Sequence, residues 1–237
     1  MSERILVAKD ITKSYGRTQV LNGVNLTINR GDRYILFGSN GAGKTTLVKI
    51  LSTILPADSG ELIIYGKKIE RHSKDIKAQI GFMSHEPYLY NELSALENLN
   101  FYANLYSIKD KKERVESLLK EVGLYHRSHD RVGSFSRGMK QRLSLARTIL
   151  HNPDIIFLDE PYTGLDISAQ EILNDIIFRQ NKEGKTFFFI AHDIGIGFDI
   201  ANRSGILSKG HIVYDAEGVE KKTFSEKYRE IIKEERD

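Results

Sequence analysis

One stretch of this sequence has the residue types and spacing to hold a chain of phosphates. Gly38-Ser39-Asn40-Gly41-Ala42-Gly43-Lys44-Thr45 follows the pattern G-x-x-x-x-G-K-[ST], with Thr46 directly behind it. Glycines let such a loop curl so that its backbone N–H groups converge on an anion. Lys44 is placed to reach the β- and γ-phosphates, and the Thr45 hydroxyl to reach a Mg²⁺ ion. The pattern predicts a nucleoside triphosphate site, against the simpler alternative of a glycine turn that happens to precede a lysine.

An acidic pair offers the complementary chemistry. Asp159 and Glu160 follow the apolar run Ile155–Leu158, and ligands of α/β sheets collect at the carboxyl ends of strands. Asp159 is therefore predicted to hold Mg²⁺ together with Thr45. Glu160 is predicted to orient the attacking water, since a carboxylate with a pKa of about 4.3 is a weak base at neutral pH and acts mainly by placing its partner. The alternative is an acidic pair that merely ends a surface strand.

A third stretch, Phe135-Ser136-Arg137-Gly138-Met139, has the features of a helix start. Ser136 is a good N-cap residue, and an apolar stripe at helical spacing continues behind it. Ser136 and Gly138 at such a helix end would present N–H groups and a positive dipole end to a second anion contact. One triphosphate seldom needs two helix ends from the same chain, whereas a second copy facing the first would use both.

The segments around these motifs are typical of an α/β fold. Ile155–Leu158 and Thr186–Ile190 are uniformly apolar, as expected of parallel strands buried on both faces. A helical pattern from Ile172 to Ile177 lies between them and predicts a βαβ unit. Tyr34–Phe37 is predicted to be a strand before the glycine loop. After the loop, apolar residues recur at helical spacing at Leu47, Ile50, Leu51 and Ile54.

The remaining segments add a β-rich start, a helical block and a charged tail. Residues 5–15 and 20–28 are rich in β-forming residues, and residues 206–214 are predicted to form a late hairpin. The pattern from residue 93 to residue 150 is helical. The tail, residues 217–237, carries apolar residues at helical spacing among many charges. The chain therefore has a helical block inserted between two halves of an α/β core.

Composition limits the possible functions. The 237 residues are 40% hydrophobic and 28% charged, as in ordinary globular proteins, and the net charge of +3 is too small to predict nucleic-acid binding. The chain has no cysteine, which excludes disulfides, thiolate zinc sites and cysteine nucleophiles. The longest apolar run, Phe187–Ala191, is far too short to span a bilayer. A function at a membrane would require another chain to cross it.

From residue 5 to about residue 215 the chain resembles the nucleotide-binding subunits of ATP-binding-cassette (ABC) transporters. The glycine loop matches the Walker A motif, Ile155–Glu160 the Walker B strand with its glutamate, and 135–139 the signature loop. Thr163–Asp166 matches the D-loop, His192 the switch histidine, and Tyr15 the aromatic residue that stacks on adenine. For Tyr15, a core tyrosine is the alternative interpretation.

The resemblance implies an ABC-type P-loop NTPase fold: a RecA-like core, an antiparallel β-subdomain and an inserted helical subdomain at about 86–152. It implies one ABC ATPase domain over residues 1–237 that ends in a charged helix at about 218–237. ATP and Mg²⁺ are the implied cofactors. The implied partners are a second copy or a paralogous ATPase subunit across the ATP sites, and transmembrane permease subunits. No nucleic acid is expected.

The sequence departs from the family pattern in three places. The signature reads Phe-Ser-Arg-Gly-Met where Leu-Ser-Gly-Gly-Gln is commonest, but Ser136 and Gly138, which face the γ-phosphate in the family, are kept. The D-loop begins with Thr163 where serine is frequent. His85 occupies the position of the Q-loop glutamine, which puts the Mg²⁺ role of that loop in doubt because imidazole is a poorer ligand for a hard cation. His85 is retained as a catalytic candidate beside Glu160 and His192.

The function expected from the resemblance is ATP hydrolysis that drives an exporter from the cytoplasmic face of the cell membrane. Export is favoured over import because no regulatory domain follows residue 237. His85, followed by the stretch Leu93–Leu99, resembles the haem-exporter ATPase of cytochrome c maturation, unless it reflects a neutral change in another exporter family. The alternative function is a soluble ABC ATPase, such as one of iron–sulfur-cluster assembly.

Overall fold

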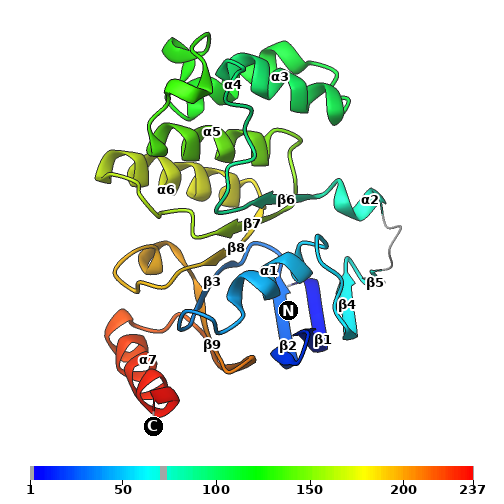
Figure 1. The fold of residues 1–237 in the computed structure, drawn as a ribbon, viewed down its shortest axis with the longest axis vertical. Coiled ribbons are helices and arrows are strands. Elements are labelled where there is room, and N and C mark those ends of the chain that lie inside the picture. Colours follow the sequence, from blue (N-terminus) through cyan, green and yellow to red (C-terminus); the bar gives the residue numbers. More distant parts are fainter. Residues whose placement is uncertain (1–2, 70–73, 237) are drawn as a thin grey trace.

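The computed structural model describes residues 3–69 and 74–236 (Figure 1). Its central sheet has the strand order β10-β9-β3-β8-β7-β6. The strands are β3 (Arg33–Phe37), β6 (Ile80–Met83), β7 (Ile155–Asp159), β8 (Thr186–Ile190), β9 (Arg203–Ser208) and β10 (His211–Glu217). Five of them pair in parallel, and β10 pairs antiparallel with β9 as the predicted late hairpin.

The middle of this sheet is buried on both faces, as the uniformly apolar runs predict. All residues of β7 and β8 are buried, and α6 (Ile167–Lys182) joins these neighbouring parallel strands as the predicted βαβ unit. Side chains alternate between two hydrophobic clusters because successive residues of a strand point to opposite faces. In β8, Phe187 and Phe189 belong to the cluster under the helices, whereas Phe188 and Ile190 face α1 (Lys44–Leu51) and the second sheet.

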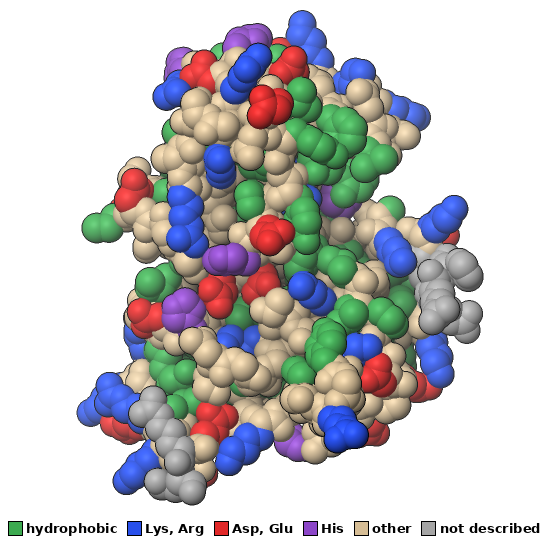
Figure 2. Space-filling view, in the orientation of Figure 1, with side chains coloured by type: hydrophobic (Ala, Val, Ile, Leu, Met, Phe, Trp, Pro, Cys, Tyr) green, Lys and Arg blue, Asp and Glu red, His purple; other side chains and the backbone are tan. Residues whose placement is uncertain are grey.

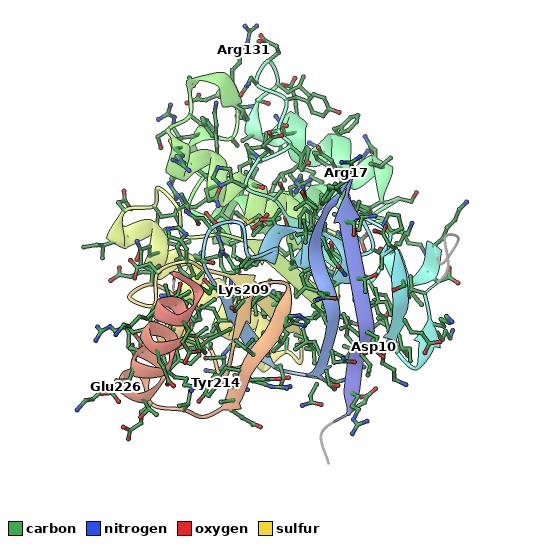
Figure 3. The ribbon with its side chains drawn as sticks, turned by 60° about the horizontal axis from the view of Figure 1, so that its bottom comes forward. Asp10, Arg17, Arg131, Lys209, Tyr214 and Glu226 are labelled. Atoms are coloured by element: carbon green, nitrogen blue, oxygen red, sulfur yellow. The ribbon has the colours of Figure 1, made fainter. Side chains whose placement is uncertain are left out.

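The second sheet is antiparallel and has the order β2-β1-β4-β5. Its strands are β1 (Arg4–Tyr15), β2 (Thr18–Asn29), β4 (Ser59–Ile64) and β5 (Lys67–Lys68). The long β1–β2 hairpin, with Arg17 at its tip, accounts for the β-rich start of the chain (Figure 3). Helix α1 ends at Leu51, so the apolar spacing that extends to Ile54 overestimates its length, and Ile54 is exposed. The short helix α2 (Lys74–Lys77) precedes β6.

Helices between β6 and β7 form a block at one end of the molecule (Figure 1). They are α3 (Ala95–Leu105), α4 (Lys111–Glu121), the 3₁₀ turns η1 (Tyr125–Arg127) and η2 (Val132–Ser134), and α5 (Arg137–Ile149). Ser94 and Glu97 form a reciprocal capping box that fixes the start of α3. The apolar spacing of α3 is only partly a core stripe, because Leu99 is buried whereas Leu105 is 67% exposed.

The charged tail forms helix α7 (Lys221–Arg236), after the short 3₁₀ turn η3 (Phe198–Ile200) and the β9–β10 hairpin. The predicted start near residue 218 is three residues early, because Gly218 has a left-handed φ of +63° between β10 and the helix. Phe224 anchors α7: it is fully buried, with ring centroids 5.1 Å from Phe37 and 5.8 Å from Tyr214. Figure 3 shows α7 beside the hairpin, with Glu226 on its outer side. Residues 1, 2, 70–73 and 237 of the predicted domain lie outside the described residues.

Candidate nucleotide site

The glycine loop lies where the sequence predicts it, between β3 and α1. Gly43 is the N-cap of α1 with a φ of +102°, and a Cβ atom there would lie 2.9 Å from the carbonyl oxygen of Val20, so both its conformation and its surroundings require glycine. The buried Lys44 folds back and donates hydrogen bonds from Nζ to the carbonyl oxygens of Gly38 (2.8 Å) and Ser39 (2.9 Å). Burial lowers the pKa of Lys44, while the charge of Glu160 opposes this shift. The ammonium group thus contacts two carbonyl oxygens, and an anionic ligand would add a charged partner beside it.

A cavity of about 360 Å³ opens beside the loop. Its lining consists of Val20, Asn40, Gly41, Gly43, Lys44, Thr45, Thr46 and Glu160. All of these except Val20 are predicted site residues. Gly38 and Ser39 accept hydrogen bonds from Lys44 through their carbonyl oxygens, and the side chain of Ala42, in the same loop, is buried. Val20 lies in β2 and belongs to no phosphate-binding motif, so no sequence pattern predicts its place in the lining.

Thr45 and Asp159 meet at the edge of this cavity. The Thr45 hydroxyl donates to Oδ1 of Asp159 at 3.3 Å. Burial raises the pKa of Asp159, the neighbouring Glu160 raises it further, and the hydrogen bond from Thr45 and the charge of Lys49 act in the opposite direction. A buried carboxylate beside a hydroxyl is an oxygen donor set suited to Mg²⁺, and a divalent cation would relieve the cost of burying the charge.

Glu160 and His192 are brought together as predicted. Nδ1 of His192 lies 3.6 Å from Oε1 of Glu160, and the Thr163 hydroxyl donates to Oε2 of Glu160 at 3.3 Å. The backbone of Glu160 is in the left-handed region with a φ of +53°, a conformation that is uncommon for a non-glycine residue. The sequence motif predicted the glutamate and the histidine, but the contact with Thr163 depends on the turn after β7 and could not be derived from the order of residues.

Tyr15, Ser136, Gly138 and the exposed His85 are predicted site residues that do not line the cavity within one chain. Tyr15 lies at the end of β1 and is 52% exposed, so the alternative of a core tyrosine is wrong. Ser136 caps α5, accepting a hydrogen bond from the Met139 N–H at 3.2 Å, as its sequence context predicts. Neither Ser136 nor Gly138 contributes to the cavity lining.

The curled loop, its lysine and the hydroxyl–carboxylate pair at the strand ends together define a P-loop nucleoside triphosphatase. A family model described as "ABC transporter" matches residues 21–163. The chain belongs to the ABC transporter family and is an ATP-binding, ATP-hydrolysing subunit of such a transporter. The predicted family, the fold class and the ATPase activity are thereby confirmed.

Relatives with assigned names agree with this placement. The chain is 34% identical to the bacitracin transport ATP-binding protein BcrA of Bacillus licheniformis over 228 residues, which cover 96% of this chain and 74% of BcrA. It is 35% identical to the lantibiotic transport ATP-binding protein SrtF of Streptococcus pyogenes over 213 residues, covering 90% and 91%. It is 31% identical to the linearmycin resistance ATP-binding protein LnrL of Bacillus subtilis (strain 168) over 211 residues, covering 88% and 68%. These names give no support to the predicted haem-exporter subtype.

Solved structures show the same fold. The dimeric post-hydrolysis state of the ATP-binding cassette MJ0796, bound to ADP and Pi, is similar with a TM-score of 0.83 at 27% identity, covering 91% of this chain and 100% of that one. A nucleotide-free cassette of an ABC transporter matches with a TM-score of 0.84 at 24% identity over 97% of both chains, a likeness of fold alone. In residues 3–69 and 74–236 of the present chain, no helix is both long and apolar enough to cross a bilayer.

Proposed function

We propose that two copies of this chain enclose two ATP molecules head to tail and power an exporter built from separate membrane subunits. The observation that carries the proposal is the separation of Ser136 and Gly138 from the cavity of their own chain. The capped N-terminus of α5 is suited to an anion, yet it has no phosphate to bind within one copy. The dimeric structures of the cassette MJ0796 support this arrangement.

Each residue of the site then has a defined role. Lys44 and the loop amides bind the phosphates, and the exposed ring of Tyr15 stacks on adenine. Thr45 and Asp159 would hold Mg²⁺, which neutralises phosphate charge when bound. Glu160 accepts a hydrogen bond from the attacking water and orients it, and His192 lies beside the same carboxylate. His85, exposed in the loop after β6, is proposed to link this site to the membrane partner.

The membrane partner is proposed to dock on the helical block. Tyr90, Phe101, Leu105 and Tyr106 are exposed there together with Tyr88, and Figure 2 shows hydrophobic side chains gathered over α3 on this face. This surface, the aromatic patch, suits an amphipathic helix at the cytoplasmic end of a permease subunit. Two residues of the patch, Tyr88 and Tyr90, belong to the loop that carries His85, and this loop would pass motion between the site and the membrane.

That loop is hydrogen-bonded to α3. The hydroxyl of Tyr102 donates to the carbonyl oxygen of Tyr88 at 2.6 Å. Asn98 accepts from the N–H of Tyr90 at 2.8 Å and donates to its carbonyl oxygen at 2.9 Å. A shift of the helical block would therefore move the loop and the patch together, as coupling to a partner requires.

We propose an antimicrobial compound as the cargo, since three relatives are named for bacitracin, a lantibiotic and linearmycin. The chain would act as a peripheral subunit on the cytoplasmic face of the membrane. Deleting the gene should increase sensitivity to such compounds and leave c-type cytochromes intact. Loss of cytochromes without any change in sensitivity would favour haem instead.

The first test is the variant Glu160→Gln. It keeps the shape of the side chain but weakens water activation, so ATP and Mg²⁺ should trap it as a dimer by size-exclusion chromatography, whereas the nucleotide-free protein stays monomeric. Glu171→Gln, on the exposed side of α6, is the matched control and should hydrolyse ATP like the wild type. Full turnover by Glu160→Gln, or a failure to dimerise with ATP, would contradict the proposal.

The second test separates a transporter from a soluble machine such as a cluster-assembly ATPase. The tagged protein is purified from detergent-solubilised membranes. A membrane-spanning protein in the complex supports transport, and its recovery should fall when charged residues replace Phe101 and Tyr106 in the aromatic patch. Recovery of only soluble partners would support the alternative function.

A further inference from the structure

The turn after β7 folds a hydroxyl back onto the proposed water-orienting carboxylate. The N–H of Thr163 donates to the carbonyl oxygen of Glu160 at 3.2 Å, and Gly164 follows with a φ of +77°. The left-handed backbone of Glu160 begins this turn. As a result, the side chain of Thr163 lies next to that of Glu160, although the two residues are three positions apart in the sequence. Oγ1 of Thr163 is 3.3 Å from Oε2 of Glu160.

Contacts on both sides fix the turn itself. The buried side chain of Gln141 in α5 donates to the carbonyl oxygen of Pro161 at 3.1 Å. The buried ring of Tyr162 donates its hydroxyl to Asn174 in α6 at 2.7 Å. Two helices therefore hold the backbone of the turn in place. Because Thr163 belongs to this turn, the position of its hydroxyl is restrained as well.

His192, the other neighbour of the Glu160 carboxylate, restrains it less than Thr163 does. The side chain of His192 is 53% exposed, and its Nδ1 lies 3.6 Å from Oε1, beyond a good hydrogen bond. A glutamate side chain has three rotatable bonds, and fixing them costs conformational entropy. The Thr163 contact engages Oε2 and leaves Oε1 free for a water molecule.

We propose that Thr163 is a positioning residue that holds Glu160 in the rotamer from which it orients the attacking water. This inference rests on the proposed role of Glu160 in ATP hydrolysis. Thr163 touches neither ATP nor the water in this scheme, so its loss should slow turnover without weakening ATP binding. The reaction itself is unchanged: water attacks the γ-phosphorus, the bond to the ADP oxygen breaks, and phosphate leaves.

The test compares Thr163→Val with Thr163→Ser. Valine keeps the shape but removes the donor, so kcat should fall about tenfold while KM for ATP stays unchanged. Serine keeps the hydroxyl and should retain most of the activity. Ser168→Ala, a hydroxyl deletion on the exposed first turn of α6, is the matched control, and melting curves confirm that each variant is folded.

A double-mutant cycle isolates the route of the effect. If Thr163 acts through the carboxylate, Thr163→Val should not lower the residual rate any further in the Glu160→Gln background. Wild-type kcat in Thr163→Val, or equal losses in the valine and serine variants, would overturn the positioning role while the proposed function stands. Wild-type turnover by Glu160→Gln alone would instead overturn the proposed function.

Discussion

Replacing Phe224 by alanine should loosen α7 from the sheet. The side chain is fully buried, and its ring centroid lies 5.1 Å from Phe37, 5.1 Å from Phe198 and 5.8 Å from Tyr214. Truncating such a phenylalanine removes its transfer free energy and leaves a cavity, a loss of about 3–5 kcal/mol. Among the described residues of α7, Ile231 is also buried, and the ring of Tyr228 packs 6.2 Å from that of Phe37. The free energy lost with the Phe224 ring is therefore large compared with that of the remaining contacts between α7 and the core.

Native-state amide hydrogen exchange measures this loss where it occurs. Undocking of α7 leaves the central strands paired, so exchange should accelerate in residues 221–235 by a factor of about 100 or more and stay nearly unchanged in α5. Glu226→Ala, on the outer side of the same helix, is the control and should leave exchange unaltered. Unchanged protection of α7 in the Phe224 variant would refute the assignment of this ring as its anchor. An equal loss of protection in α5 would show that α7 and the core unfold together.

Two further predictions concern the nucleotide site. Because burial raises the pKa of Asp159, the folded chain keeps this proton to a higher pH than the unfolded chain, and stability falls as pH rises above about 4. Asp159→Asn should therefore lose less thermal stability than the nucleotide-free wild type between pH 4 and about pH 7, and parallel melting curves would contradict this. Tyr15→Ala should weaken ATP binding about tenfold in calorimetric titrations, and Tyr15→Phe should preserve it because stacking requires only the ring. Equal losses in both variants would reject stacking.

The sequence predicted those parts of the fold that depend on local patterns. The glycine loop, the buried strands on either side of α6 and the N-cap at Ser136 each carry a short-range signal, and each is found in place. Errors arose where a pattern continues beyond its element. The apolar spacing runs on to the exposed Ile54 after α1 has ended at Leu51.

The site was predictable as a set of residues but not as an arrangement. Motif order identified Lys44, Asp159 and Glu160, yet the backfolded Lys44 and the left-handed Glu160 are properties of the tertiary structure. Val20 enters the lining only because the β1–β2 hairpin lies against the loop. Contacts between residues far apart in the chain depend on sheet register and helix packing, which one sequence does not encode in any local pattern.

Arg137, which departs from the commonest signature sequence, packs against Gly164 in the turn that carries Thr163. A Cβ atom on Gly164 would lie 2.7 Å from both Cδ and Nε of Arg137, so the long side chain at one position occupies the space that a methyl group would need at the other. A turn from another cassette that carries a side chain at position 164 would therefore require Arg137 to move. A chimera that exchanges this turn together with the signature loop should remain functional where exchange of the turn alone fails.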